Sequence, residues 1–289
     1  MNKLITRTAF TRVAPASLVI VSFMALGCAD KINYLKARNE LNKGVRSFTA
    51  ADYPSAVTFF ESALDLDPDL TDALGYRAYS YMMQFIPGTE TPDNERFAKN
   101  AIDGFNDVLE RDPNSKFAIA SLASLYFNMK EFDKATEWHM KRIQVLEDEA
   151  ASSEDGMIDP VAAESYYTIG VISWSQSYEP RLQLRADLSM QQEDPGPIKA
   201  GEEKEELSAK VVPVIDRGMD AINKALEINP DYADAMAYMN LLFREKSDFV
   251  ETSAEYEELQ AQADEWVQKT LDTKKRLNDA ETFDQFSSE

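Results

Sequence analysis

The sequence is poor in the residues that build cross-links and metal clusters. Of its 289 residues, one is a cysteine and one is a histidine. A single cysteine cannot form an intrachain disulfide or a cysteine-based metal cluster. A single histidine excludes a zinc site or a proton relay made of several histidines. Glycine is also scarce, with 10 residues, which argues against a fold rich in tight turns.

Basic residues are the second deficit. Lys and Arg number 30 against 51 Asp and Glu, which gives a formal net charge of −21. Such an excess of negative charge repels phosphate, so we expect no nucleic-acid partner. The acids are spread along the chain, as is typical of a solvated surface.

Motifs of nucleotide binding and nucleophilic catalysis are missing from the sequence. The lone His139 falls inside an expected helix, which predicts a packed imidazole. The alternating aspartates at 65–69 resemble the start of a calcium loop, but Leu70 and Tyr76 stand where that loop requires Gly and Glu. We therefore expect no enzymatic activity, no metal site and no cofactor.

The N-terminal segment has the layout of a secretory signal. Residues 1–12 carry three basic side chains and no acid, and residues 13–27 are apolar and uncharged. This apolar run is shorter than the roughly 20 residues that a membrane-spanning helix needs. A basic region followed by a short apolar region predicts a signal peptide rather than a membrane span.

The apolar run ends in Ala25-Leu26-Gly27-Cys28, which resembles the bacterial lipobox, with Ala25 where leucine is commoner. The resemblance implies cleavage after Gly27 and acylation of Cys28, which would bind the chain to a lipid bilayer. Each buried acyl methylene contributes about 0.8 kcal/mol to such an anchor. In bacterial lipoproteins, Ala29 instead of aspartate implies the outer membrane, facing the periplasm. The mature chain would carry a formal net charge of −24.

The mature chain contains internal repeats. Residues 37–70 resemble the 34-residue tetratricopeptide repeat, a helical hairpin. Small residues in this motif let the two helices approach closely, and a proline stops the second helix. The small positions are Gly44, Ala56 and Ala63, the aromatic positions are Tyr53 and Phe60, and the closing proline is Pro68.

Less regular repeats follow, and two insertions near 82–98 and 175–211 interrupt them. Within the second insertion, residues 193–206 are polar and rich in turn formers, so we expect a loop there. The second repeat starts at Thr71, the third at Lys116 and the fifth at Asp234, while the fourth is split between 162–174 and 214–230.

The resemblance to tetratricopeptide proteins implies an all-α fold, in which helical hairpins stack into an α-α superhelix. Apolar residues with one-sided helical spacing near the C-terminus predict a long capping helix, which an open array needs over its last apolar face. We expect a signal peptide over 1–27, a tether over 28–36, the array over 37–250, the capping helix over 251–277 and a disordered tail over 278–289.

Tetratricopeptide arrays bind peptides on a concave surface formed by the first helix of each hairpin. Aromatic side chains on that surface are candidate anchors for a partner. The candidates here are Tyr126, Tyr166 and Trp174. Packing between helices is the competing interpretation for Trp174, as it is for Trp138 and Trp266.

Two functions fit these features. The first is a lipid-anchored scaffold that mediates protein–protein interactions with envelope proteins or peptides whose identity the sequence does not give. The second is an accessory lipoprotein that binds a small ligand and is associated with solute transport, which requires a deep apolar cavity beside the insertion at 175–211. An enzyme would instead need clustered carboxylates with perturbed pKa values in a cleft.

Overall fold

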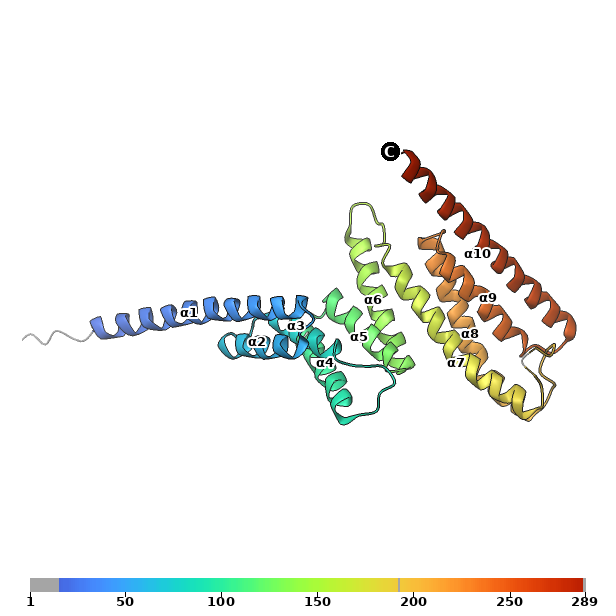
Figure 1. Ribbon diagram of the computed structural model, residues 1–289, viewed down its shortest axis with the longest axis horizontal. Coiled ribbons are helices and arrows are strands. Elements are labelled where there is room, and N and C mark those ends of the chain that lie inside the picture. Colours follow the sequence, from blue (N-terminus) through green and yellow to red (C-terminus); the bar gives the residue numbers. More distant parts are fainter. Residues whose placement is uncertain (1–15, 192, 288–289) are drawn as a thin grey trace, which may run out of the picture. The chain divides into compact units, whose positions relative to one another are not determined.

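The computed structural model describes residues 16–287 apart from residue 192, and the side chains of residues 31–280 and 282 among them. Residues 1–15 of the expected signal peptide and the side chain of Cys28 lie outside the described part. The described residues form ten α-helices and no β-strand (Figure 1). This confirms the all-α helical-hairpin fold that the repeats predict.

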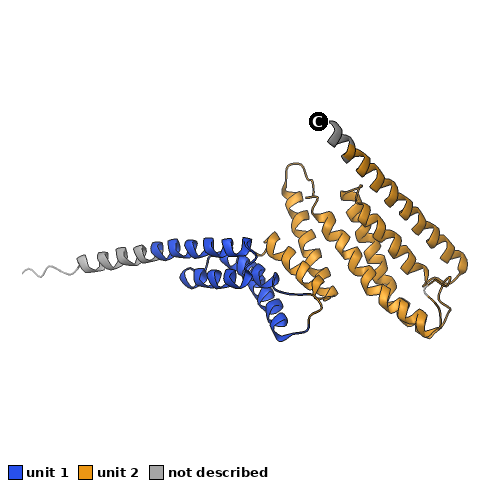
Figure 2. Cartoon of the chain, viewed as in Figure 1, with its two compact units in different colours: residues 1–86, 90–111 blue, residues 87–89, 112–289 orange. Residues whose placement is uncertain are grey.

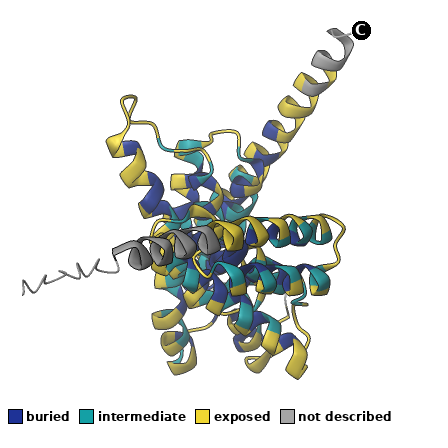
Figure 3. Cartoon of the chain, turned by 90° about the vertical axis from the view of Figure 1, so that its left-hand side faces the viewer, coloured by how far each residue is buried: buried dark blue, intermediate teal, exposed yellow. Residues whose placement is uncertain are grey.

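The chain divides into two compact units (Figure 2). The first comprises Met1–Ile86 and Glu90–Arg111, and the second comprises Pro87–Thr89 and Asp112–Glu289. In both units the buried side chains lie on the faces where helices meet, and the outer faces are exposed (Figure 3). Each unit is therefore built from amphipathic helices that cover one another.

The first unit consists of two helical hairpins, and their inner helices α2 and α3 also pack against each other. One hairpin pairs α1 (Ala16–Thr49) with α2 (Tyr53–Leu66), and the other pairs α3 (Thr71–Met82) with α4 (Pro92–Arg111).

Two segments of the first unit are more helical than we expected from the sequence. Residues 28–36, expected as a tether, are part of α1, and α4 begins at Pro92, inside the insertion expected near 82–98. Proline is favourable in the first turn of a helix because its missing N–H has no partner there. Within the described residues, no helix combines the length and apolar character that crossing a bilayer requires.

The second unit consists of three hairpins. Helix α7 contacts its partner α8 and also α6 and α9 of the neighbouring hairpins. The hairpins pair α5 (Lys116–Asn128) with α6 (Phe132–Ser152), α7 (Ala162–Asp187) with α8 (Glu202–Ile228), and α9 (Ala233–Ser247) with α10 (Ser253–Ser287).

The insertion at 175–211 is mostly helical. Helix α7 continues through Pro180 to Asp187, and only 188–201 lies between α7 and α8. The expected loop at 193–206 therefore ends earlier, because Glu202 and the acids after it form the first turn of α8. Negative charge is favourable there, next to the positive end of the helix dipole.

Helix α10 packs along α9 as the second helix of the last hairpin. Its buried residues include Ala263, Thr270 and Thr273. The helix reaches Ser287, whereas the sequence suggested an end near residue 277 and a disordered tail over 278–289. No glycine or proline interrupts the sequence between Ser253 and Ser287, so nothing local ends the helix earlier.

Helices within a hairpin approach closely where one of them carries glycine. A Cβ atom at Gly44 of α1 would lie 2.4 Å from the ring of Phe60, which is fully buried on α2. The α7–α8 hairpin shows the same packing, because a Cβ at Gly170 would lie 2.4 Å from Ile222. The small residues of the repeat therefore set the distance between the helices.

The only histidine of the chain is buried in the second unit. His139 lies on α6 with 7% of its surface exposed, and neither ring nitrogen has a hydrogen-bond partner among the described residues. Burial first, and then the charge of Arg142, lowers the pKa of His139 from 6.5 to about 4. The imidazole is therefore neutral at neutral pH and acts as a packed side chain.

Enlarging Gly44 should destabilise the first hairpin. A valine side chain at this position overlaps the ring of Phe60, and overpacking of this kind costs about 1–3 kcal/mol. We expect Gly44→Val to lower the free energy of unfolding by about that amount, measured by urea unfolding. Gly201→Val is the control, because a Cβ there meets nothing closer than 3.5 Å. Equal losses in both variants would contradict this packing.

The buried imidazole should make stability depend on pH. Between pH 6.5 and about 4, the unfolded chain protonates at His139 before the folded chain does. The free energy of unfolding should therefore fall as the pH drops through this window, by up to about 3 kcal/mol from this group alone. Urea unfolding of His139→Leu should show a shallower fall than the wild type. Parallel pH profiles would rule out this role.

Candidate partner-binding site

Five aromatic side chains form a continuous line of ring contacts along α7 and the start and middle of α9. The ring centroid of Tyr167 lies 4.9 Å from that of Tyr232 and 5.5 Å from that of Tyr238. The ring of Trp174 lies 5.8 Å from Tyr238 and 4.8 Å from Tyr178. All five are half-buried, so each ring packs on one side and is partly accessible on the other. We call these five residues the aromatic seam.

The seam follows from the helical period and from the contact between α7 and α9. Tyr167, Trp174 and Tyr178 are seven and four residues apart, which places them on one face of α7. Tyr167, Trp174 and the α9 residue Tyr238 pack on the apolar core of the second unit, which includes Met239. The core therefore fixes the inner side of the seam.

Three tyrosines of the seam, Tyr167, Tyr232 and Tyr238, have hydroxyl groups that are held in the protonated form. Burial first, and then the neighbours Tyr238, Tyr232 and Asp234, raises the pKa of Tyr167 to about 12. Burial also raises the pKa of Tyr232 and of Tyr238, with Asp234 contributing to both. These phenols are consequently hydrogen-bond donors over the whole physiological pH range.

A buried ionic network lies at one end of the seam. The guanidinium of Arg181 sits over the ring of Tyr178, 5.6 Å from its centroid. It donates to Glu245 at 2.6 and 3.1 Å and to Asp248 at 2.8 Å, and Asp248 also accepts from Arg185 at 2.8 Å. Burial alone would lower the pKa of Arg181, but its bonds to Glu245 and Asp248 raise it. Arg181 therefore stays charged, whereas burial raises the pKa of Glu245. The bidentate contacts between Arg181 and Glu245 fix α7 against α9.

The same network attaches the segment between α7 and α8. Arg185 donates to the backbone carbonyl of Gln191 at 2.9 Å, and the backbone N–H of Ile198 donates to the carbonyl of Asp248 at 3.0 Å. The side chain of Ile198 is 1% exposed. The inserted segment is thus packed against the end of α9 through both polar and apolar contacts.

The structure places the three predicted partner-binding residues in different surroundings. Trp174 is central to the seam, while the hydroxyl of Tyr166 donates to Glu147 at 2.9 Å. Burial first, and then this bond, raises the pKa of Tyr166 to about 12. Tyr126 lies on α5 with the ammonium of Lys134 5.3 Å from its ring centroid. The involvement of all three in partner binding stays a prediction, as does acylation of Cys28.

Four members of the seam were not identified from the sequence. The spacing of Tyr167 and Tyr178 around Trp174 is a local signal that marks one helical face. Tyr232 and Tyr238 gave no such signal, because their proximity to Trp174 depends on the packing of α9 against α7.

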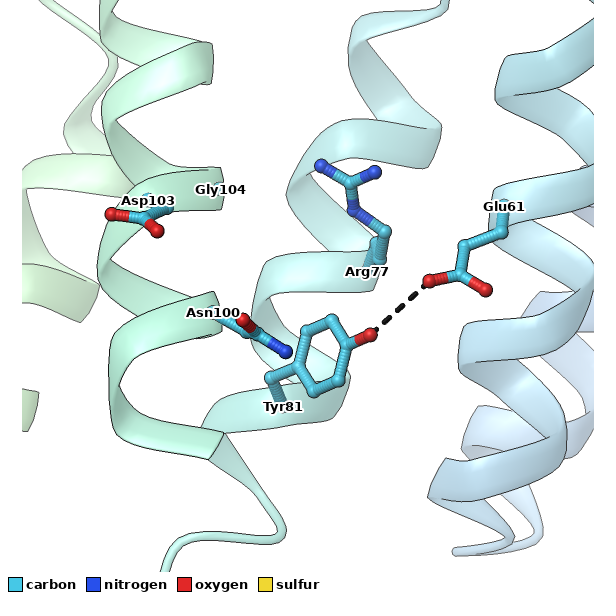
Figure 4. Close-up of a pocket in the computed structure, with 6 residues that line it drawn as sticks. All are labelled: Glu61, Arg77, Tyr81, Asn100, Asp103 and Gly104. Carbon is cyan, nitrogen blue, oxygen red and sulfur yellow. Dashed lines mark hydrogen bonds between the residues drawn. The ribbon is translucent and has the colours of Figure 1, made fainter. Parts of the chain in front are cut away.

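The first unit has a polar pocket of about 270 Å³ between α2, α3 and α4 (Figure 4). The hydroxyl of Tyr81 donates to Glu61 at 3.2 Å, and burial followed by the charge of Glu61 raises the pKa of Tyr81. Charged and amide groups line an open space here, unlike the deep apolar cavity that binding of an apolar small ligand would need. The lining residues are Glu61, Arg77, Tyr81, Asn100, Asp103 and Gly104.

Metal ligands do not converge in the described part of the chain. No group of three or more His, Cys, Asp or Glu side chains there is placed to hold a metal ion. Some acidic residues form ion pairs between neighbouring hairpins, for example Asp72 with Arg38 at 3.0 Å and Asp216 with Lys246 at 2.7 Å.

No protein-family model and no curated protein sequence matches the chain. Solved structures do match it. A crystal structure of MamA is 16% identical, with a TM-score of 0.54, over 83% of this chain and 93% of that one. A MamA RS-1 ArsTM double mutant is 14% identical, with a TM-score of 0.52, over 84% and 97%. YrrB, described as a TPR protein with an unusual peptide-binding site, is 13% identical, with a TM-score of 0.45, over 82% and 90%.

At these identities the similarity to MamA concerns the fold alone. Together with the hairpins and the repeat residues, it defines the chain as an all-α array of the tetratricopeptide type.

Removing the shared acid of the ionic network should destabilise the second unit. Asp248→Asn deprives Arg181 and Arg185 of their common carboxylate, and breaking a buried pair in this way costs about 3–5 kcal/mol. We expect urea unfolding to show a loss of about 3 kcal/mol. Asp72→Asn is the matched control, because its side chain is 64% exposed and its pair with Arg38 is worth at most about 1 kcal/mol. Comparable losses in the two variants would argue against the network.

Proposed function

We propose that this protein is a lipid-anchored scaffold of the bacterial cell envelope that binds a protein partner along the aromatic seam. The observation that carries the proposal is the seam itself. Its rings lie on α7 and α9, the first helices of successive hairpins. In tetratricopeptide arrays this position forms the surface that receives peptides.

The composition of the seam suits a protein partner. Trp and Tyr are enriched among the residues that dominate binding energy, because they offer large apolar area with few rotatable bonds. The protonated phenols of Tyr167 and Tyr238 add hydrogen-bond donors. The bonds of Arg181 to Glu245 and Asp248 hold α7 and α9 in place, so little order needs to be gained on binding.

The charge around the seam favours a partner that is basic as well as apolar. Asp234 lies close enough to raise the pKa of Tyr167, Tyr232 and Tyr238, and Glu164 acts on Tyr232. The mature chain as a whole would carry a formal net charge of −24. Such a field accelerates the approach of a positively charged protein or peptide.

The anchoring part of the proposal is supported by the sequence. A basic segment, an apolar run and the Ala25–Cys28 lipobox precede the array, and Ala29 favours the outer membrane with the array in the periplasm. The protein acts by binding, without a cofactor or a reaction of its own. Small-ligand binding is less favoured, because the segment at 188–201 packs through Ile198 and the ionic network.

The test is affinity purification of the tagged full chain from detergent-solubilised membranes of its own bacterium, followed by mass spectrometry. We expect a specific partner whose recovery falls at least tenfold in Tyr178→Ala and in Trp174→Ala, because loss of a central aromatic anchor costs about 2 kcal/mol or more. Cys28→Ser should lose the acyl mass and leave the outer-membrane fraction.

The control is Trp138→Ala, a half-buried tryptophan on α6 that lies outside the seam. It should retain the partner, and thermal melting should show that the seam variants are folded. A folded wild-type protein that is recovered alone, or a partner that survives both seam substitutions, would refute binding along the seam.

A further inference from the structure

The charge of the chain is distributed unevenly. Residues 29–46 hold five basic and two acidic side chains, whereas residues 47–289 hold 22 basic and 49 acidic ones. The basic residues of the first segment all lie on α1. A positively charged stretch of α1 therefore begins next to Cys28, in a chain that is otherwise strongly negative.

The first described side chains of α1 are exposed although several are apolar. Ile32, Tyr34 and Leu35 are 52%, 48% and 67% exposed. Among the described residues of the helix, Ala37 is the first that is buried, and α1 packs on α2. Among the residues of this unit whose side chains are described, none covers Ile32, Tyr34 or Leu35 from a neighbouring helix.

Residues 31–36 are exposed on all sides of α1, and Ile32 and Leu35 share one face there because they are three residues apart. The exposed Asn39, Asn42 and Arg46 continue that face at spacings of four, three and four residues. Lys31 and Lys36 are exposed and lie next in sequence to Ile32 and Leu35, so they border the apolar strip on both sides. We call Lys31, Ile32, Leu35 and Lys36 the α1 docking face.

The lysines of this face are available to bind an anion. Among the residues whose side chains are described, neither Lys31 nor Lys36 lies within ion-pair distance of a carboxylate. Lys43 and Arg38, further along the helix, do have such partners, in Glu40 at 2.7 Å and Asp72 at 3.0 Å.

We infer that the α1 docking face lies on the surface of an anionic phospholipid bilayer. The inference rests on the proposed lipid anchor at Cys28, which precedes Ile32 by four residues and Leu35 by seven. At 1.5 Å per residue, Leu35 lies only about 10 Å along the helix from the anchored residue. Cleavage after Gly27 would make Cys28 the first residue of α1. An acylated Cys28 would then hold the α1 docking face at the headgroups.

The chemistry of the face matches that surface. Apolar side chains at the centre of a helical face enter the boundary between headgroups and acyl chains, while bordering lysines extend their ammonium groups to the phosphates. Each lysine near an anionic surface strengthens binding about fivefold. The acidic remainder of the chain is repelled by the same lipids, so only this end of the first unit docks.

The test measures the accessibility of individual lysines in the full chain. The protein is held in vesicles of phosphatidylcholine alone or of phosphatidylcholine with phosphatidylglycerol, labelled briefly with an amine-reactive reagent and analysed by peptide mass spectrometry. We expect Lys31 and Lys36 to be labelled at least fivefold more slowly in the anionic vesicles, and the difference to disappear at high salt. Lys199 and Lys210, exposed in the second unit, serve as internal references.

A variant pair separates docking from general effects of the lipid. Ile32→Glu with Leu35→Glu retains both reporting lysines and should abolish their protection. Met83→Glu with Ile86→Glu places the same charge on exposed apolar residues elsewhere in the first unit and should leave the protection intact. Equal labelling of Lys31 in the two vesicle types, or protection that survives Ile32→Glu with Leu35→Glu, would overturn the inference.

The outcome can be distinguished from failure of the anchor. Intact-mass analysis of the protein extracted from membranes reports acylation of Cys28 directly. An acylated protein whose Lys31 and Lys36 are labelled equally in both vesicle types has an anchor but no docking face. A chain without acyl mass has no lipid anchor, and labelling with added vesicles still reports whether the face binds anionic lipid.

Discussion

The structure depends on the close approach of paired helices at small residues. At Gly44 and at Gly170, a single added methyl group would overlap the partner helix. The ridge of one helix, at Phe60 or Ile222, fills the space that each glycine leaves. Because this contact fixes the rotation of each helix, it also decides which side chains remain on the outside of the array, including those that could meet a partner.

The regular part of the fold could be predicted because its determinants are local. Gly44 and Phe60 lie within one repeat, and their complementarity is visible as a small and a large residue at fixed spacing. The continuation of α7 through Pro180 could not be predicted in this way. Arg181 is held by Glu245, a residue 64 positions further along the chain, and no local pattern announces that pairing.

The candidate site could likewise be predicted only where its residues follow a local pattern. Trp174 could be identified because it lies on a helix that the repeat pattern defines, whereas Tyr238 joins it only through the packing of α9 on α7. The buried ion pairs of Arg181 account for the part of the site that the sequence did not predict. Arg181 links the seam to the segment at 188–201 through Asp248, so the proposed partner-binding surface and the inserted segment form one connected structure. The net charge of the whole chain, −21, gave no sign that residues 29–46 are basic.

The continuity of α1 has a mechanical consequence. The helix passes from the residues around Cys28 to Thr49, and no glycine or proline occurs between Ala29 and Lys43. A chain anchored at Cys28 would therefore be held by a rigid helical segment about 20 Å long rather than by a flexible linker. The distance and tilt of the first hairpin relative to the bilayer would be set by the angle at which this helical segment meets the membrane. A force on the hairpin would reach the anchored residue as a torque.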